Sequence, residues 1–289
     1  MKWVCGSRRR WALLVGGVLA LGVVTGGVLA QQGRYRRDEH NAKEIPPLTD
    51  RHGIDEWPVD PQFKSDLFTF VRIRWHSWRG GDIWLTDYPD SDLNFSFRLQ
   101  QMTSLKVDPH PKQLDLTDPE VFDYPFIYML EVGSLEFTDE EIVALRRYLL
   151  NGGFLMVDDF WGIPAWQNFE REMKRVFPDR ESVDLPIEHP IFHSVFDLRQ
   201  KPQIPGIDTA REVRAAGHPE ISYERNDAKE SHYRAFFDDK GRMMAIICQN
   251  TDLGDGWERE GEEEWYFHQY SEKQAYPMGI NIIFYAMTH

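Results

Sequence analysis

The chain has 289 residues, is 42% hydrophobic and carries a formal net charge of −14. A charge of this sign argues against nucleic acid or an anionic membrane surface as a partner, because both attract basic proteins.

The first thirty residues have the pattern of an export signal. Four basic residues precede an uncharged segment from Trp11 to a small-residue cleavage site at Ala30. This pattern predicts a signal peptide over residues 1–30. An uncleaved membrane anchor is the alternative, because the apolar stretch approaches the ~20 residues that cross a bilayer. Residues 7–11 also loosely fit a twin-arginine signal, so the export route stays open. We expect a periplasmic or extracytoplasmic location, with membrane attachment only if residues 11–30 are retained.

Cleavage after Ala30 would leave a net charge of −18 and one cysteine, Cys248, since residues 1–30 carry four positive charges and no negative ones. Cys248 ends an apolar run and is expected to be an inert buried thiol. Residues 31–61 are polar and proline-bearing, and we predict a disordered tether there. Residues 62–289 are enough for a single α/β domain with a substantial core.

The domain shows strands and helices in alternation. An alternating pattern over residues 67–75 predicts a first strand, and apolar residues at helical spacing follow Asp92. Continuous apolar runs over 126–130 and 154–157 predict strands buried on both faces of a parallel sheet. The segment of about 196–234 is irregular and is predicted to be an insertion over one edge of the sheet. Further predictions from apolar periodicity are a helix over 166–177, a strand over 243–248 and a closing helix over 280–287.

The two continuous runs enclose one complete β-α-β unit. Thr138 and Glu141 form a capping box at the start of the helix between them, and an Asn-Gly-Gly sequence ends it. The unit predicts an α/β fold with a doubly wound parallel sheet. Glu131 follows the first run, and Asp158 and Asp159 follow the second. Ligands of open α/β sheets lie outside the carboxyl ends of the strands, so these acids are expected at a site.

Several motifs extend this pattern across the domain. They are Gly80-Gly-Asp-Ile-Trp84, Asp92-Leu-Asn94, Tyr124-Pro-Phe126, Thr138-Asp-Glu-Glu141, Asn151-Gly-Gly153, His189-Pro-Ile-Phe192, Asn250-Thr-Asp-Leu-Gly-Asp-Gly-Trp257 and the ending from Gly279 to His289. In these motifs the chain resembles the bacterial domain-of-unknown-function family numbered 4159, over roughly residues 63–289. The resemblance implies a class I glutamine amidotransferase-like fold, which is a flavodoxin-like three-layer sandwich. It brings no established activity.

The chain departs from true amidotransferases at the residues that carry their chemistry. Those enzymes have a cysteine nucleophile at a strand-to-helix turn, and a histidine and a glutamate after a later strand. The corresponding turns, residues 131–134 and 158–162, contain no cysteine, and Ser134 lacks flanking glycines. Asn250, Asp252 and Asp255 follow the later strand. Glutamine hydrolysis through a thiol is therefore not expected.

The predicted crevice collects acidic, amide and aromatic side chains. Its ligand-binding candidates are His76, Glu131, Asp158, Asp159, Trp161, Asn250, Asp252, Asp255 and Trp257. Carboxylates crowded together raise one another's pKa values or recruit a cation, and oxygen ligands suit Ca²⁺ or Mg²⁺. The metal candidates are Asp158, Asp252 and Asp255. The simpler interpretation is that Asp158, Asp159 and Asp252 cap helices or bind backbone amides in turns.

The catalytic candidates are Asp158, Asp159 and His189. Histidine titrates near neutrality and can act as a general acid or base, although a structural loop histidine is the alternative. Tryptophans in the turns suit the face of a sugar ring or, alternatively, fill the core.

Two functions follow as hypotheses. The first is a non-catalytic exported domain that binds a ligand or a protein partner, such as a saccharide or an envelope protein, at the carboxyl ends of its strands. The second is a metal-assisted or two-carboxylate hydrolase acting on saccharide or cell-envelope material.

Overall fold

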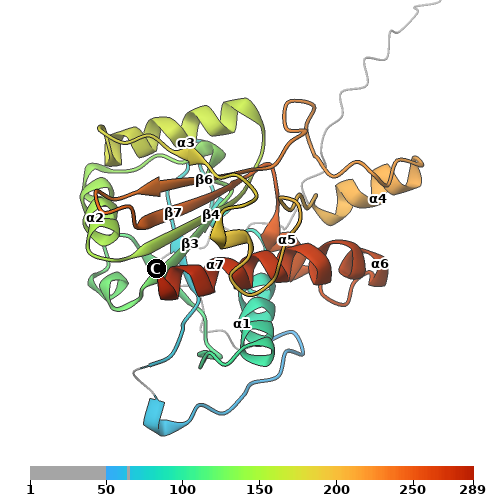
Figure 1. Ribbon diagram of the computed structural model, residues 1–289, viewed down its shortest axis with the longest axis horizontal. Helices are drawn as coiled ribbons and strands as arrows, with labels where there is room; N and C mark the ends of the chain where they lie inside the picture. Colours follow the sequence, from blue (N-terminus) through green and yellow to red (C-terminus); the bar gives the residue numbers. More distant parts are fainter. Residues whose placement is uncertain (1–49, 64–65) are drawn as a thin grey trace, which may run out of the picture. The chain divides into compact units, whose positions relative to one another are not determined.

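The computed structural model describes residues 50–63 and 66–289, and its centre is a seven-stranded sheet (Figure 1). The strand order is β2-β1-β3-β4-β7-β6-β5. The sheet is parallel except at β6, which runs antiparallel to both of its neighbours. The strands are β1 (Val71–Arg74), β2 (Lys112–Asp115), β3 (Phe126–Leu130), β4 (Phe154–Phe160), β5 (Val183–Asp184), β6 (His232–Phe237) and β7 (Met243–Gln249).

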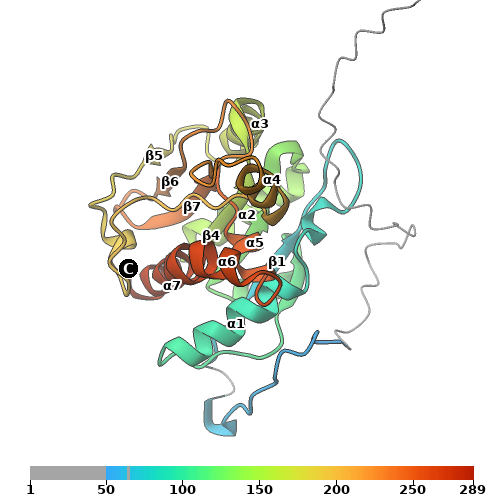
Figure 2. The same ribbon diagram turned by 90° about the vertical axis from the view of Figure 1, so that its right-hand side faces the viewer.

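Helices cover both faces of the sheet, which makes the chain an α/β protein. In Figures 1 and 2, α2 and α3 lie on one face, and α1, α5 and α7 lie on the other. The helices are α1 (Asp90–Met102), α2 (Asp139–Leu150), α3 (Gly162–Val176), α4 (Ile207–Ala215), α5 (Leu253–Glu258), α6 (Glu264–Tyr266) and α7 (Tyr276–Thr288). A π-helical segment, η6 (Phe267–Ala275), joins α6 to α7.

The predicted β-α-β unit is confirmed. It consists of β3, α2 and β4, and Leu130 at the end of β3 pairs with Asp158 in β4. Thr138 caps α2 with its side chain, and Glu141 completes the capping box. Strand β4 continues to Phe160, so Asp158 and Asp159 lie within the end of the strand instead of following it.

The segment over residues 196–234 is more regular than expected. It contains α4, which buries only Ile207 and Ala210 and so has a weak apolar period, and it leads into β6. The short strands β2 and β5 were also not predicted. β5 has only two residues, both exposed, so burial leaves no hydrophobic pattern in its sequence.

The order of the strands defines a topological switch point. The first connection runs outward from β1 to β2, and the next returns to β3 on the other side of β1. The carboxyl ends of β1 and β3 therefore flank a topological switch point, where open α/β sheets bind ligands.

The N-terminal part of the domain begins before residue 62. Arg51 donates to the carbonyl of Pro109 at 2.7 Å, and Trp57 Nε1 donates to the carbonyl of Val107 at 2.8 Å. Both residues belong to the segment predicted as a tether, whose end is thus fixed to the domain. The predicted signal peptide over residues 1–30 lies outside the described residues. Within the described part, no helix is long and apolar enough to cross a bilayer.

Candidate functional site

Four residues in a strained backbone conformation lie at the carboxyl edge of the sheet. Asp87, Glu131, Asp159 and Asn250 have positive φ angles of 61°, 54°, 48° and 61°. Asp87 lies in the connection after β1, Glu131 follows β3, Asp159 lies near the end of β4, and Asn250 follows β7. Residues other than glycine seldom adopt this conformation, and such strain clusters at functional sites. The backbone therefore points to the same edge as the predicted acids.

Three carboxylates from three different segments converge there. Asp87, Asp159 and Asp252 each offer one oxygen, and these oxygens lie within 4.8 Å of one another. The pairing of β4 with β7 shifts between Val157 and Phe160, which marks a β-bulge at the two aspartates of β4. Bulges re-aim side chains beside active sites. We call Asp87, Asp159 and Asp252 the acid trio.

The acid trio has few protein partners. Trp161 Nε1 donates to Asp159 Oδ1 at 3.0 Å. Asp252 Oδ1 accepts the backbone N–H of Asp255 at 2.6 Å and thereby caps α5. Asp87 Oδ2 is shielded from solvent and has no hydrogen-bond partner among the described residues. Within residues 50–63 and 66–289, no basic side chain forms an ion pair with the trio, whereas nearby Asp92 and Asp255 have arginine partners.

Asp158 lies beside the trio and is completely buried. Its Oδ2 accepts the N–H of Gly254 at 2.9 Å and the Tyr128 hydroxyl at 3.2 Å. Its Oδ1 has no partner in the described chain. Gly254 permits this approach, since a Cβ there would lie 2.6 Å from Asp87 Oδ2. Asp158 and Asp252 thus bind backbone amides, as the simpler interpretation expected, but they also add charge to one cluster.

Burial raises the pKa values of these carboxyl groups, and for Asp87 the nearby Arg72 and Arg259 oppose the shift only in part. Desolvation raises the pKa of Asp87, Asp159 and Asp252 well above the ordinary aspartate value, and neighbouring acids raise them further. Desolvation also raises the pKa of Asp158 to about 7, although its hydrogen bonds oppose the shift. Ionised carboxylates are costly to bury alone, so a cluster of this kind holds either protons or a cation.

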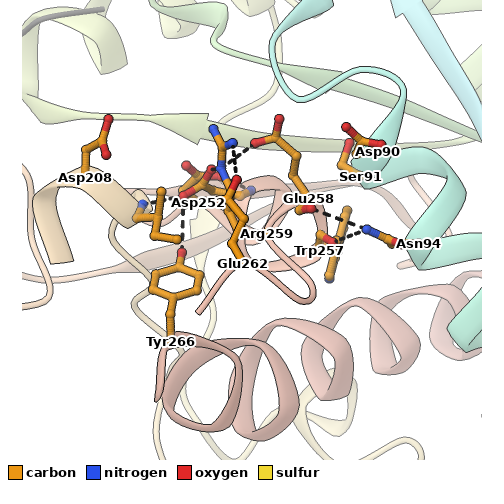
Figure 3. A network of polar contacts seen from close by, with 12 residues as sticks. Asp90, Ser91, Asn94, Asp208, Asp252, Trp257, Glu258, Arg259, Glu262 and Tyr266 are labelled. Carbon is orange, nitrogen blue, oxygen red and sulfur yellow. Dashed lines mark hydrogen bonds and ion pairs between the residues drawn. The ribbon is translucent and has the colours of Figure 1, made fainter. Parts of the chain in front are cut away.

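A second acidic group adjoins the trio and differs from it in having its own cation. Asp87, Asp255 and Glu258 also offer oxygens within 4.8 Å of one another. Arg259 Nε, however, lies 2.9 Å from Asp255 Oδ1 and 2.8 Å from Glu258 Oε2. Figure 3 shows Arg259 beside Glu258, with the Tyr266 hydroxyl directed toward the network. Because the guanidinium of Arg259 already pairs with two of these three acids, the acid trio is the better metal candidate.

Glu131 and Glu224 extend the acidic region toward the switch point. Desolvation raises the pKa of Glu131 to about 7, with Glu224 adding to the shift and Arg79 opposing it. Glu224 Oε1 accepts the N–H of Gly206 at 2.8 Å. A Cβ at Gly206 would lie 3.7 Å from Asp252 Oδ2, so the segment that carries Glu224 is anchored directly beside the trio.

The two predicted histidines lie apart from the trio. His76 is exposed, and its Nε2 lies 3.8 Å from Glu136. His189 caps a short 3₁₀ helix, and its ring packs 5.5 Å from that of Tyr285 near the end of α7. Burial lowers the pKa of His189. Neither histidine has a contact with Asp158 or Asp159 that would support a shared acid–base role.

The tryptophans mostly fill the core. Trp257 is fully buried, with its ring 4.3 Å from that of Phe95. Trp75 is buried and donates to the carbonyl of Leu130 at 3.1 Å. Trp161 is also buried, whereas Trp78 is 52% exposed. The core interpretation thus describes Trp75, Trp161 and Trp257 better than an open aromatic crevice does.

Neither Ser134 nor Cys248 is available as a nucleophile in the acidic region. Ser134 Oγ is hydrogen-bonded to Ser77 Oγ at 2.7 Å, and burial raises the pKa of Cys248 well above its ordinary value. The side chain of Asn250 accepts the N–H of Gly162 at 2.9 Å, so it holds the turn after β4 in place.

Asp87 is the main site residue that sequence reasoning missed. The buried guanidinium of Arg72 fixes its loop by donating to the carbonyls of Trp84 at 2.9 Å and Thr86 at 2.7 Å. Arg72 is itself paired with the buried Asp92. Its position in the sequence could have identified it, because an acid in the connection after the first strand lies at the switch point. Glu224, in the insertion, offered no such signal.

One comparison with known proteins identifies a family for this chain. A search of curated proteins found no match. The family model described as "Domain of unknown function (DUF4159)" matches residues 69–287, which span β1 to α7 and include the acid trio. The chain therefore belongs to the DUF4159 family.

Proposed function

We propose that this chain is a non-catalytic domain that binds a divalent cation, Ca²⁺ or Mg²⁺, at the acid trio. One observation carries the proposal: Asp87, Asp159 and Asp252 bring oxygens within 4.8 Å of one another, with no basic partner among the described residues. Carboxylate oxygens are the preferred ligands of both cations. The unpartnered, buried oxygens of Asp87 and Asp158 are a second observation that favours a missing positive group.

The alternative hydrolase differs in what it requires of the carboxylates. Two-carboxylate glycosidases keep their carboxyl groups about 5–9.5 Å apart, so that a sugar or a water fits between them. Oxygens within 4.8 Å of one another suit a shared cation better. A metal-assisted hydrolase would need the same cation. It differs from a binding domain in that it hydrolyses a substrate, so an assay for turnover distinguishes the two. The bound cation could instead present open coordination positions to a saccharide or an envelope protein.

A melting experiment tests the cation proposal. Residues 31–289 are melted in EDTA and then with Ca²⁺, Mg²⁺, Mn²⁺ or Zn²⁺. A cation at 100 times its dissociation constant stabilises the fold by about 2.7 kcal/mol, which raises the melting temperature by several degrees. We expect this rise with Ca²⁺ or Mg²⁺, and its loss in Asp252→Asn, since asparagine still caps α5.

Asp208→Asn is the matched control. Asp208 is an exposed acid in the first turn of α4, outside the trio (Figure 3). This variant should keep the full response. If no cation shifts the melting temperature of the wild-type protein, the proposal is wrong.

We also propose the finer fold and the location. The order of the five parallel strands, 2-1-3-4 followed by β7, is that of flavodoxin-like sheets and supports a class I glutamine amidotransferase-like fold without the thiol. The export signal supports a periplasmic or extracytoplasmic location. Expression of the full chain in a bacterium, followed by mass spectrometry of the exported protein, should give an N-terminus at Gln31. An intact N-terminus in the membrane fraction would instead identify residues 11–30 as an anchor.

A further inference from the structure

We propose that a polar pocket beside the acid trio binds an uncharged, polyhydroxylated ligand of the saccharide class. The pocket has a volume of about 530 Å³, within the range of about 300–1,000 Å³ usual for small-molecule sites. Its walls include Gln200, Lys229, Ser231, His232 and Gln269. They come from the β5–β6 edge of the sheet, from the segments at residues 200–203 and 219–231, and from η6.

A set of internal contacts holds the walls in place. Asp184 of β5 accepts from His232 Nδ1 at 2.6 Å and from Lys201 Nζ at 2.8 Å. On the other side, Gln203 donates to the carbonyl of Asn250 at 3.1 Å and accepts the hydroxyl of Ser222 at 2.9 Å. The pocket is therefore built on the end of β7 and on the edge of the sheet, not on loops alone.

Other polar groups of the lining remain available. Gln200, Ser231 and Gln269 also line the pocket, and the side chains of Gln200 and Gln269 are exposed. An amide offers both donors and acceptors, and a hydroxyl can act as either. Sugar hydroxyls have the same dual character, so these side chains match a saccharide better than a ligand with only donors or only acceptors.

The charges of the lining favour a neutral ligand. Asp184 is already neutralised by Lys201 and His232. Lys229 faces the same pocket as Glu220 and Glu230, which leaves no excess of positive charge for an anion. A lone cation would find stronger ligands in the acid trio than among amides.

The geometry of η6 supports a functional origin for the pocket. Gln269, Tyr270 and Gln274 reach it from this π-helical segment, which extends over nine residues. π-helical turns are rare and occur mostly at functional sites.

The pocket is a separate site from the acid trio, although one segment serves both. Residues 219–231 place Ser222 and Ser231 at the pocket and Glu224 beside Gly206 at the trio. Saccharide binding can therefore succeed or fail independently of cation binding.

Saturation-transfer NMR on residues 31–289 tests the proposal. The probes are uncharged mono- and disaccharides of glucose, galactose, mannose and N-acetylglucosamine, with Ala-Ala dipeptide as the zwitterionic comparison. Gln269→Trp should fill the pocket from an exposed position of η6 and weaken saccharide binding at least tenfold. Lys273→Trp, also exposed and one turn further along the same segment but outside the lining, is the matched control and should bind as the wild type does.

Three outcomes would overturn the proposal. They are the absence of transfer to every saccharide, transfer to the dipeptide in preference to the sugars, and saccharide binding that Gln269→Trp leaves unchanged. Unfolding does not confuse the result, because circular dichroism and melting of both tryptophan variants report it directly. The NMR experiment is repeated in EDTA, which removes any cation from the trio. The saccharide signal is expected to persist, because the pocket and the trio are separate sites.

Discussion

Replacing Asp87 by asparagine is expected to stabilise the cation-free protein and to abolish its stabilisation by Ca²⁺ or Mg²⁺. Asp87 Oδ2 has no hydrogen-bond partner in the described chain, so the substitution removes no such contact there. It does remove a buried carboxyl group whose pKa is raised by desolvation, with Glu258 and Asp255 adding to the shift and Arg72 and Arg259 opposing it, so that the group costs stability when no cation is bound. The variant should therefore gain stability without a cation and lose the stability that a cation provides. A purely structural carboxylate would not produce both effects.

The magnitudes can be separated in one set of melts. In EDTA, relief of repulsion should raise the stability of Asp87→Asn by about 1 kcal/mol, the size of a moderate change in a like-charge interaction. With saturating cation, the wild-type protein should gain about 2.7 kcal/mol or more and the variant close to none. Isothermal titration calorimetry gives the lost affinity directly.

Asp90→Asn is a suitable control for this prediction. Asp90 is three residues further along the chain, and its side chain pairs with His52 outside the trio. The control should lose a little stability in EDTA, because a partly exposed ion pair contributes at most about 1 kcal/mol. It should retain the full response to the cation. If Asp87→Asn keeps the same stabilisation by Ca²⁺ or Mg²⁺ as the control, Asp87 is not a ligand of the cation.

The parts of the fold that sequence reasoning predicted are marked either by complete burial or by a local hydrogen-bond motif. Strands β3, β4 and β7 are completely buried, so each contains a continuous apolar run, and α2 begins at a capping box that local hydrogen bonds determine. The elements that were missed are exposed or polar. β5 pairs at the edge of the sheet, and α4 buries only Ile207 and Ala210, so neither element leaves a strong period in the sequence.

The candidate site was predictable only where it follows directly from the strands. Asp158, Asp159 and Asp252 are adjacent to β4 and β7, and the rule for open sheets places them correctly at the carboxyl edge. Asp87 arrives through a long connection whose path depends on the buried Arg72, a contact that no local pattern encodes. The tryptophans left two interpretations open for a related reason, because nothing in the sequence distinguishes a buried Trp257 from an exposed Trp78.

The cation-free protein should be most stable in mild acid and lose stability as the pH rises toward 8. Desolvation raises the pKa of Asp158 and Glu131 to about 7 and that of Glu258 to about 8. In the unfolded chain these groups titrate near 4, so between about pH 4 and pH 8 the folded protein binds more protons than the unfolded one. The stability that a raised pKa provides is fully present at pH values below the pKa of the unfolded chain. It is lost as the pH rises through the pKa of the folded protein. The completely buried Asp158 alone accounts for a loss on the order of 4 kcal/mol.

Carboxyls with lowered pKa values act in a different window. Asp227 and Asp238 accept backbone N–H groups, and these hydrogen bonds contribute to lowering their pKa values. Their contribution to stability is fully present at pH values above the pKa of about 4 in the unfolded chain. It is lost as the pH falls through their lowered pKa values in the folded protein. Together the two classes place the maximum stability of the cation-free protein near pH 5.

Melts in EDTA between pH 4 and pH 8 measure this dependence, and Asp158→Asn should flatten its upper limb because asparagine does not titrate. Adding Ca²⁺ or Mg²⁺ should reverse the trend, since a cation competes with protons for the trio and binds more tightly as they leave. The gain in melting temperature from the cation should therefore be small at pH 5 and largest at pH 8. A cation-free protein whose melting temperature rises steadily from pH 5 to pH 8 would show that the buried acids are ionised and neutralised within the fold. Such a fold would have no need of the cation that the geometry of Asp87, Asp159 and Asp252 favours.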